Sequence, residues 1–402
     1  MSITKSLALR APAINPKSAL WNLGFRPFFL GAAIFAVISM ALWTGVYIHH
    51  WPLPIQKITM FQWHAHEMIY GFAMAVIAGF LLTAVKNWTG VQTLHGAGLM
   101  GLFALWAVPR VLFLFGTPLL AIAGFFDVVF MVGLIAAIFH PIYQVKQWKQ
   151  AGILVILALL LLGNLLFYLG TAGIVENGVW ISSRAGLFLI IGLILFMGRR
   201  VIPFFIEVGV GYPIKVKNSA RLDQAIIGLY SLFLIAEVGI GNEWLVAVLA
   251  LALLIANSIR LAGWYTPGIW KKPLLWSLFI AFAAINLGFL LMVLTPLLKL
   301  SPLMVLHAFS VGGIGVIILS MMARVTLGHT GRNVQQPPKT VPIALLILLA
   351  GAVFRVIVPL LTSHYYLMWV AISQLLWIAA FLLFLISYLP MLIKPRVDGQ
   401  FG

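Results

Sequence analysis

The sequence predicts an all-α, polytopic membrane bundle of about 12 transmembrane helices with both termini in the cytoplasm. Three observations support this fold class: the composition, the long apolar runs and the placement of the basic residues. The chain of 402 residues is 63% hydrophobic and only 8% charged, whereas soluble proteins average about 25% charged residues. No soluble globular domain of this length has such a composition.

The apolar runs are long enough to be membrane spans, because crossing about 30 Å of hydrocarbon takes roughly 20 residues in a helix. The expected spans, in order, cover residues 27–48, 63–85, 95–115, 118–140, 151–171, 181–204, 223–240, 243–263, 273–296, 302–326, 341–361 and 366–393. The very short connections at 240–243 and 361–366 predict tight hairpins between antiparallel neighbours.

Basic residues lie mostly on one side of this arrangement. All 25 Lys and Arg residues fall in cytoplasmic segments except Lys57, Arg184 and Lys299 on the outer side, and Arg110 and Arg355 within spans. The positive-inside rule therefore fixes the orientation and explains the net charge of +17. In a soluble protein that charge would suggest nucleic acid; here we expect the lipid bilayer as partner and no nucleic acid.

The organisation that follows is a single integral membrane domain over residues 1–402. It has a cytoplasmic N-terminal segment at 1–23 and a central cytoplasmic loop at 205–222. Residues 1–23 contain no long apolar run, so we expect no cleavable signal peptide and an N-terminus that stays in the cytoplasm. The chain has no cysteine, which excludes iron–sulfur clusters, thiolate haem ligation and disulfides.

Residues 63–72 (WHAHEMIYGF) place two histidines and a glutamate at the mouth of the second apolar run. His307 opens the tenth run at the same outer side. Ionisable groups are costly in hydrocarbon and persist where they are paired, bind a metal or line a pathway. We therefore predict a redox metal, with His64, His66 and His307 as candidate ligands.

Helical geometry separates the two neighbouring histidines. Residues are about 100° apart around an α-helix, so His64 and Glu67 should share a face while His66 points nearly opposite. We expect one of the two histidines to be an axial haem ligand and the other to face a neighbouring helix. Glu67 is expected to accept the ring N–H of the ligating histidine.

Haem in a helical bundle takes an imidazole from one helix or from two facing helices. His307 is the natural partner across the bundle, and haem b is the expected cofactor. Copper is a less favoured alternative, since Met60 and Met304 lie four and three residues before a histidine, and thioether with imidazole suits Cu(I). Methionine in an apolar bundle more often serves packing.

The two arginines within spans have competing interpretations. Arg110 and Asp127 lie toward the outer ends of consecutive antiparallel spans, so a salt bridge across that hairpin is the favoured reading. Arg110 or Arg355 is alternatively a partner for a haem propionate, because the guanidinium fork suits a carboxylate.

Four motifs resemble those of the NnrS family. They are residues 24–30 (GFRPFFL), 64–68 (HAHEM, followed by Gly71-Phe72), 307–313 (HAFSVGG) and 322–332 (MARVTLGHTGR). They occur in the family's order, and the matched ionisable residues are Arg26, His64, His66, Glu67, His307, Arg324 and His329. The resemblance implies a multi-pass protein of the bacterial inner membrane that contains haem and copper. It also implies a role in responding to, or resisting, nitric oxide and nitrosative stress.

A wider similarity has limits. Outer histidines on spans two and ten resemble the low-spin haem arrangement of haem–copper oxidases and nitric oxide reductases. Those enzymes also take metal ligands from histidines on spans six and seven, and this chain has none there. Redox activity on nitric oxide or its products, with a quinol or cytochrome as electron donor, would therefore need a differently built site.

Two other function classes remain open at this point. A secondary transporter of a small anion or a metal complex fits the six spans on either side of the central loop. A haem-binding sensor or assembly partner without turnover is the third class. We expect Arg26 and Arg324, both cytoplasmic, to be structural.

Overall fold

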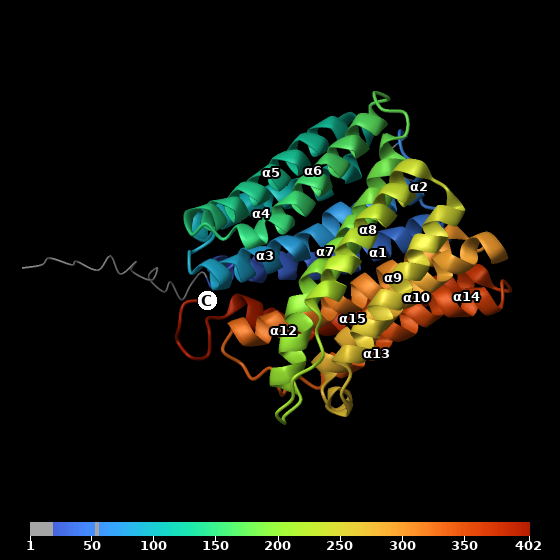
Figure 1. Ribbon diagram of the computed structural model, residues 1–402. Coiled ribbons are helices and arrows are strands. Elements are labelled where there is room, and N and C mark those ends of the chain that lie inside the picture. Colours follow the sequence, from blue (N-terminus) through green and yellow to red (C-terminus); the bar gives the residue numbers. More distant parts are fainter. Residues whose placement is uncertain (1–18, 53–55) are drawn as a thin grey trace, which may run out of the picture.

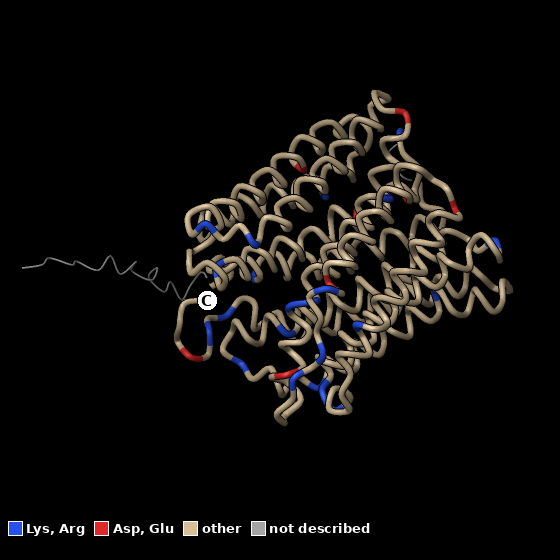
Figure 2. Tube along the Cα trace, viewed as in Figure 1, with Lys and Arg blue, Asp and Glu red and all other residues tan. Residues whose placement is uncertain are grey.

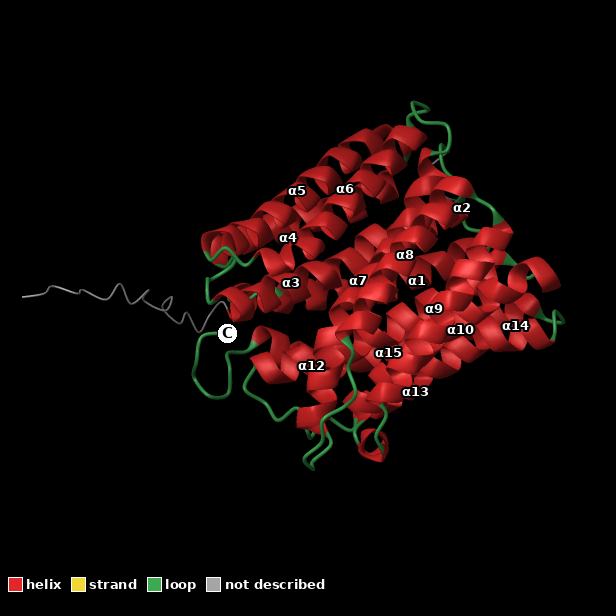
Figure 3. Ribbon diagram, in the orientation of Figure 1, coloured by secondary structure: helices red, strands yellow, loops and turns green. Residues whose placement is uncertain are grey.

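A computed structural model describes residues 19–52 and 56–402. All regular elements in these ranges are helices (Figure 3). Twelve of them are long and apolar enough to cross a membrane, which confirms the predicted fold class. The spans, numbered 1 to 12, are Phe25–Ile48, Met60–Thr89, Gly96–Phe115, Thr117–Gln144, Trp148–Thr171, Gly178–Gly209, Ala220–Ile240, Glu243–Trp264, Pro273–Leu298, Pro302–His329, Thr340–Leu361 and Tyr366–Ile393.

Eight spans consist mainly of one α-helix each: α1 (Phe25–Ile48), α4 (Gly96–Leu112), α5 (Leu120–Gln144), α6 (Ala151–Thr171), α7 (Gly178–Gly209), α9 (Glu243–Trp264), α10 (Pro273–Leu298) and α15 (Tyr366–Ile393). The other four contain a π-helical segment. They are α2 (Met60–His66), η2 (Glu67–Ala73) and α3 (Met74–Thr89); α8 (Ala220–Ile235) and η6 (Ala236–Ile240); α11 (Pro302–His307), η8 (Ala308–Gly315) and α12 (Val316–His329); and α13 (Thr340–Ala352), η9 (Val353–Ile357) and α14 (Val358–Leu361).

The central loop is shorter than the sequence predicts. Helix α7 continues to Gly209 and α8 begins at Ala220, so the loop occupies residues 210–219 rather than 205–222. The last turn of α7 is retained because it packs into the protein: Ile206 is 1% exposed. Of the expected N-terminal segment, residues 1–18 lie outside the described ranges, and Ala19–Trp21 form a short 3-10 helix.

Three spans form the interior of the bundle. In spans 2, 10 and 6 respectively, 89%, 67% and 56% of the most apolar window is buried, more than in any other described span. Their helices contact one another, α7 with η2 and η8, and α3 with α12. In Figure 1, α3 and α7 run between a layer containing α4, α5 and α6 and a layer containing α9, α10, α13 and α15. The inner helices thus recur every fourth span.

Charge marks the two ends of the bundle. Figure 2 shows most Lys and Arg residues near the end where the C-terminus lies. By the positive-inside rule this end, here called the basic end, faces the cytoplasm. His64 and His307, at the starts of spans 2 and 10, therefore lie toward the opposite end, the outer end. The chain is a multi-pass membrane protein.

Candidate functional site

A cavity of about 410 Å³ lies near the outer end, between the inner spans and spans 1, 11 and 12. We call it the outer cavity. Much of its wall is aromatic, with Trp43, Phe72, Trp180 and Trp377 among the lining residues. Its main polar lining groups come from five different spans: His64, Arg184, His307, Ser310, Arg355 and Gln374.

His307 is held in one tautomer. Its Nδ1 lies 2.6 Å from the carbonyl oxygen of Leu303, one turn earlier on the same helix. A carbonyl only accepts a hydrogen bond, so Nδ1 carries a hydrogen, and in the neutral ring Nε2 then keeps its lone pair. A ring nitrogen prepared in this way by a hydrogen bond on its opposite side is the usual form of a metal-ligating histidine.

His64 is oriented by stacking. Its ring lies parallel to the indole of Trp43, with centroids 4.3 Å apart and an interplanar angle of 10°. Across the described residues, neither ring nitrogen of His64 has a hydrogen-bond partner. The stack fixes the plane of the imidazole and leaves both nitrogens available to a ligand.

Two cations and an amide complete the polar wall. Arg184 is neutralised by Glu237, with Nη1 2.6 Å from Oε1. Arg355 donates only to the hydroxyl of Tyr366, at 3.3 Å, and pairs with no carboxylate of the described residues. Gln374 is 4% exposed, and neither heteroatom of its amide has a partner in the described parts of the chain. A buried polar group without a partner costs about 1–3 kcal/mol, so the amide of Gln374 is available to bind a ligand or an ordered water in this cavity.

The π-helical segments adjoin this cavity. Segment η2 follows His64, η8 follows His307, η9 contains Arg355, and η6 contains Glu237, the partner of Arg184. A π-helical turn is rare and is frequently found at a functional site, because it inserts an extra residue and re-aims the side chains of one turn. Four such turns next to the polar groups of one cavity favour a functional role for it.

The opposite face of span 2 carries a buried ion-pair network. Arg110 donates to Glu67 at 2.9 Å and to Asp127 at 2.6 Å. Tyr168 also donates to Asp127, at 2.6 Å. His66 joins this network, with Nδ1 2.9 Å from Glu67 and Nε2 3.0 Å from the Asn164 oxygen. The imidazole of His66, the three charged groups and the amide of Asn164 are each at most 7% exposed.

This geometry changes the role expected for His66 and Glu67. His66 does point away from His64, as predicted, but both of its ring nitrogens are occupied by protein groups. Glu67 bonds to His66 and Arg110 rather than supporting His64. The reason is the ion pair that Glu67 forms with Arg110 of span 3, because a buried carboxylate requires a cationic partner. We therefore assign both residues to the ion-pair network.

The predicted salt bridge between Arg110 and Asp127 is confirmed. Both carboxylates of the network bind Arg110, and this arginine is not among the residues lining the outer cavity. Gly71 provides the space for it, since a Cβ at that position would lie 2.7 Å from Nη1. Of the two arginines considered for a haem propionate, the geometry favours Arg355.

The matched motif residues at the basic end have structural contacts. Arg26 is fully buried, and its Nη1 donates to the carbonyls of Met391, Leu392 and Lys394 at the end of α15. Arg324 lies over the ring of Phe205, 3.8 Å from its centroid. These contacts agree with the structural roles expected for both arginines. His329 lies at the same end, with Nε2 3.4 Å from the amide nitrogen of Asn87.

The donor set around the outer cavity limits which metal centres fit. Residues 19–52 and 56–402 contain no group of three or more His, Cys, Asp and Glu side chains that could hold a metal ion. Met60 and Met304, the expected thioether donors, do not line the cavity, whereas Met40 and Met68 do. A centre that needs only two protein ligands fits best.

Some site residues have no distinguishing signal in the sequence. Gln374 is a lone amide in an apolar span, and Trp43 is one of 14 tryptophans, so neither had a distinguishing neighbour in the sequence. The ion pair of Arg184 and Glu237 could be predicted more readily, because two opposite charges at the outer ends of spans 6 and 7 suggest a pair.

Fold and site together define a polytopic helical membrane protein with a histidine-lined cavity at one end of the bundle. The chain belongs to the NnrS family: the family model described as NnrS protein matches residues 19–396, nearly its whole length. No curated protein matches the chain.

Proposed function

We propose that this NnrS-family protein binds haem b in the outer cavity, where His64 and His307 would hold its iron. The observation that supports the proposal most is the pair of imidazoles from spans 2 and 10 in one aromatic-walled cavity, where Nδ1 of His307 donates to a backbone carbonyl and leaves Nε2 as its ligand atom. Haem iron receives four ligands from its own ring, so two protein ligands complete the site.

The remaining groups of the cavity suit the other parts of such a cofactor. Arg355 has no carboxylate partner in the described structure, and a guanidinium matches a propionate in charge and shape. Trp43, Phe72 and Trp377 supply apolar surface for a flat ring. Gln374 supplies an unused donor and acceptor. Haem would provide an iron that binds nitric oxide or exchanges electrons with a quinol or cytochrome donor.

Copper is the second metal in this proposal. A copper ion has no porphyrin to complete its coordination, so it would rely on thioether sulfur in addition to imidazole. Met68, four residues after His64, and Met40 line the cavity. They replace Met60 and Met304 as the methionines to test.

The physiological role that we propose is the response to, or resistance against, nitric oxide and nitrosative stress, at the bacterial inner membrane. It rests on the family membership together with a cavity suited to a redox metal near the outer face. Redox turnover on nitric oxide or its products belongs to the same proposal.

The test is spectroscopic. The protein, produced with ample haem and copper and purified in detergent, is expected to show a stoichiometric haem band that shifts with nitric oxide, with metal analysis on the same sample. His307→Ala and His64→Ala should each abolish or strongly alter that band. His364→Ala is the matched control, because His364 is an exposed histidine near the outer end. Absence of both metals from the unaltered protein would overturn the proposal and favour the transporter reading.

A further inference from the structure

Two further cavities continue from the outer cavity toward the basic end. The middle one, of about 100 Å³, shares Ala73 and Ile190 with the outer cavity. The third, of about 340 Å³, shares Phe80, Met197 and Val201 with the middle one. The three therefore follow one another along the inner helices, from the histidines at the outer end to the basic end.

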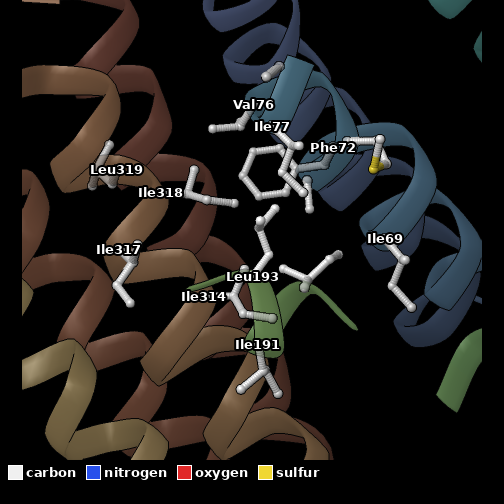
Figure 4. Packing of buried hydrophobic residues seen from close by; sticks show 14 of the residues in the cluster. Ile69, Phe72, Val76, Ile77, Ile191, Leu193, Ile314, Ile317, Ile318 and Leu319 are labelled. Carbon is white, nitrogen blue, oxygen red and sulfur yellow. The ribbon is translucent and has the colours of Figure 1, made fainter. Parts of the chain in front are cut away.

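The middle cavity, which we call the apolar chamber, has a wall with no exposed polar atom. Spans 2, 6 and 10 contribute most of its lining. Figure 4 shows Val76 and Ile77 of α3, Leu193 of α7 and Ile318 of α12 directed toward one another between these helices. Each of these four side chains is at most 9% exposed.

The cavities on either side of the chamber differ from it in chemistry. The outer cavity presents the histidines and arginines described above. The cavity at the basic end includes Asn87, Arg200 and His329 in its lining. Phe80 and Met197, which belong to both this cavity and the chamber, separate the polar groups from the apolar wall.

Size and polarity define what this chamber can hold. An apolar cavity of about 150 Å³ stays dry and takes up xenon or benzene, because water there would lack the two to four polar partners it needs. An ion would lose its hydration without compensation. A small uncharged molecule loses little on entering and gains dispersion contacts with the surrounding methyl groups.

We propose that the apolar chamber is a binding site for small uncharged molecules of diatomic size, and that these molecules pass through it to the outer cavity. Binding in the chamber is independent of any cofactor. The passage to the histidines rests on the proposed function, since it assigns the arriving molecule a destination at the haem. An anion or a metal complex is excluded from this route by the same wall.

Xenon is the probe for the first half of the proposal. The protein in lipid nanodiscs, with isotope-labelled isoleucine δ-methyl groups, is titrated with xenon pressure and followed by NMR. The methyl groups of Ile77 and Ile318 should shift saturably. Ile259 faces outward and is 58% exposed, so its methyl should show only the unsaturable drift of a lipid-facing group. A common unsaturable drift at all three would overturn the proposal.

Two variants locate the effect. Val76→Phe fills the chamber and should remove the saturable shift at Ile318, whereas Val132→Phe, the same change at a 50% exposed position of α5, should leave it intact. Ile318→Ala enlarges the chamber and should raise xenon uptake, measured at the methyl group of Ile77. This variant tests the same binding site if Val76→Phe does not fold. Unchanged xenon binding in a folded Val76→Phe protein would contradict the assignment.

The passage is tested separately in the haem-loaded protein. The rate constant for nitric oxide binding should be several-fold lower in Val76→Phe than in Val132→Phe, at equal haem content. Equal rate constants in the two variants would overturn the proposed passage through the chamber. The xenon titration would still decide whether the chamber is a binding site. Protein that carries no haem but retains the xenon shifts would refute the proposed function alone.

Discussion

At its outer end, span 2 carries a histidine on each of two faces, and the two faces differ in how many of their polar groups have hydrogen-bond partners within the protein. His64 faces a cavity in which it, Arg355 and Gln374 are only partly engaged by other protein groups. His66, two residues later, lies in a network in which both imidazole nitrogens and both carboxylates have hydrogen-bond partners within the protein. Proximity in sequence therefore does not predict a common role.

The difference between the two faces shows that hydrogen-bond partners distinguish structural polar groups from ligand-binding ones. Inside a membrane bundle a polar group must find its partner within the protein or in a bound ligand. The network of Arg110, Glu67 and Asp127 provides its own partners and joins spans 2, 3 and 4. Arg355 has no carboxylate partner and Gln374 no hydrogen-bond partner among the described residues, which is the arrangement expected where a ligand supplies them.

The largest expected loss of stability comes from removing the arginine of the ion-pair network. Arg110→Met leaves two buried carboxylates without their cation, and breaking such a pair costs about 3–5 kcal/mol. Arg355→Met, which removes an arginine that pairs with no described carboxylate, should cost far less. Thermal unfolding of both variants in the same detergent measures the difference. Equal losses of stability would remove the distinction between the two faces.

A smaller difference in stability is expected between variants of His66 and His307. In protein produced without haem, His66→Ala leaves Glu67 and Asn164 short of a partner and should lower stability by about 1–3 kcal/mol. His307→Ala removes only the bond to the carbonyl of Leu303 and should leave the unfolding temperature nearly unchanged. A larger loss from His307→Ala than from His66→Ala would reverse the assignment of these residues.

The smallest effect concerns an exposed ion pair outside the spans. Arg396 donates to Asp398 at 2.9 Å and holds the pKa of that carboxyl at about 2, below its ordinary value of 3.8. Because the pKa is lowered on folding, the pair's contribution is present above the ordinary value and is lost as the pH falls through about 2. Asp398→Asn should therefore leave the unfolding temperature at neutral pH essentially unchanged, since exposed pairs contribute little.

NMR titration of the Asp398 carboxyl carbon checks the pKa itself. Arg396→Gln should return the midpoint toward 3.8, the ordinary value. A midpoint that stays near 2 in this variant would show that a group other than Arg396 lowers the pKa. A marked loss of stability in Asp398→Asn would mean that this exposed pair behaves like the buried one.

Much of the architecture could be predicted from the sequence, because hydrocarbon imposes strict local requirements on a chain. Twelve apolar runs of sufficient length gave twelve spans, since every backbone polar group must be bonded within its own helix. The pairing of Arg110 with Asp127 followed from opposite charges on consecutive spans. The outer-end location of His64 and His307 followed from counting spans.

The sequence by itself determined the fold class, the number of spans, the orientation implied by the basic residues and the family motifs. The tertiary structure alone decided which histidine faces the cavity, which helices lie inside and where the chamber is. Its π-helical turns change the angular phase of spans 2, 7, 10 and 11, and a regular period of 3.6 residues cannot anticipate them. Likewise, the absence of a partner at Gln374 depends on helices far apart in the chain, so no local pattern records it.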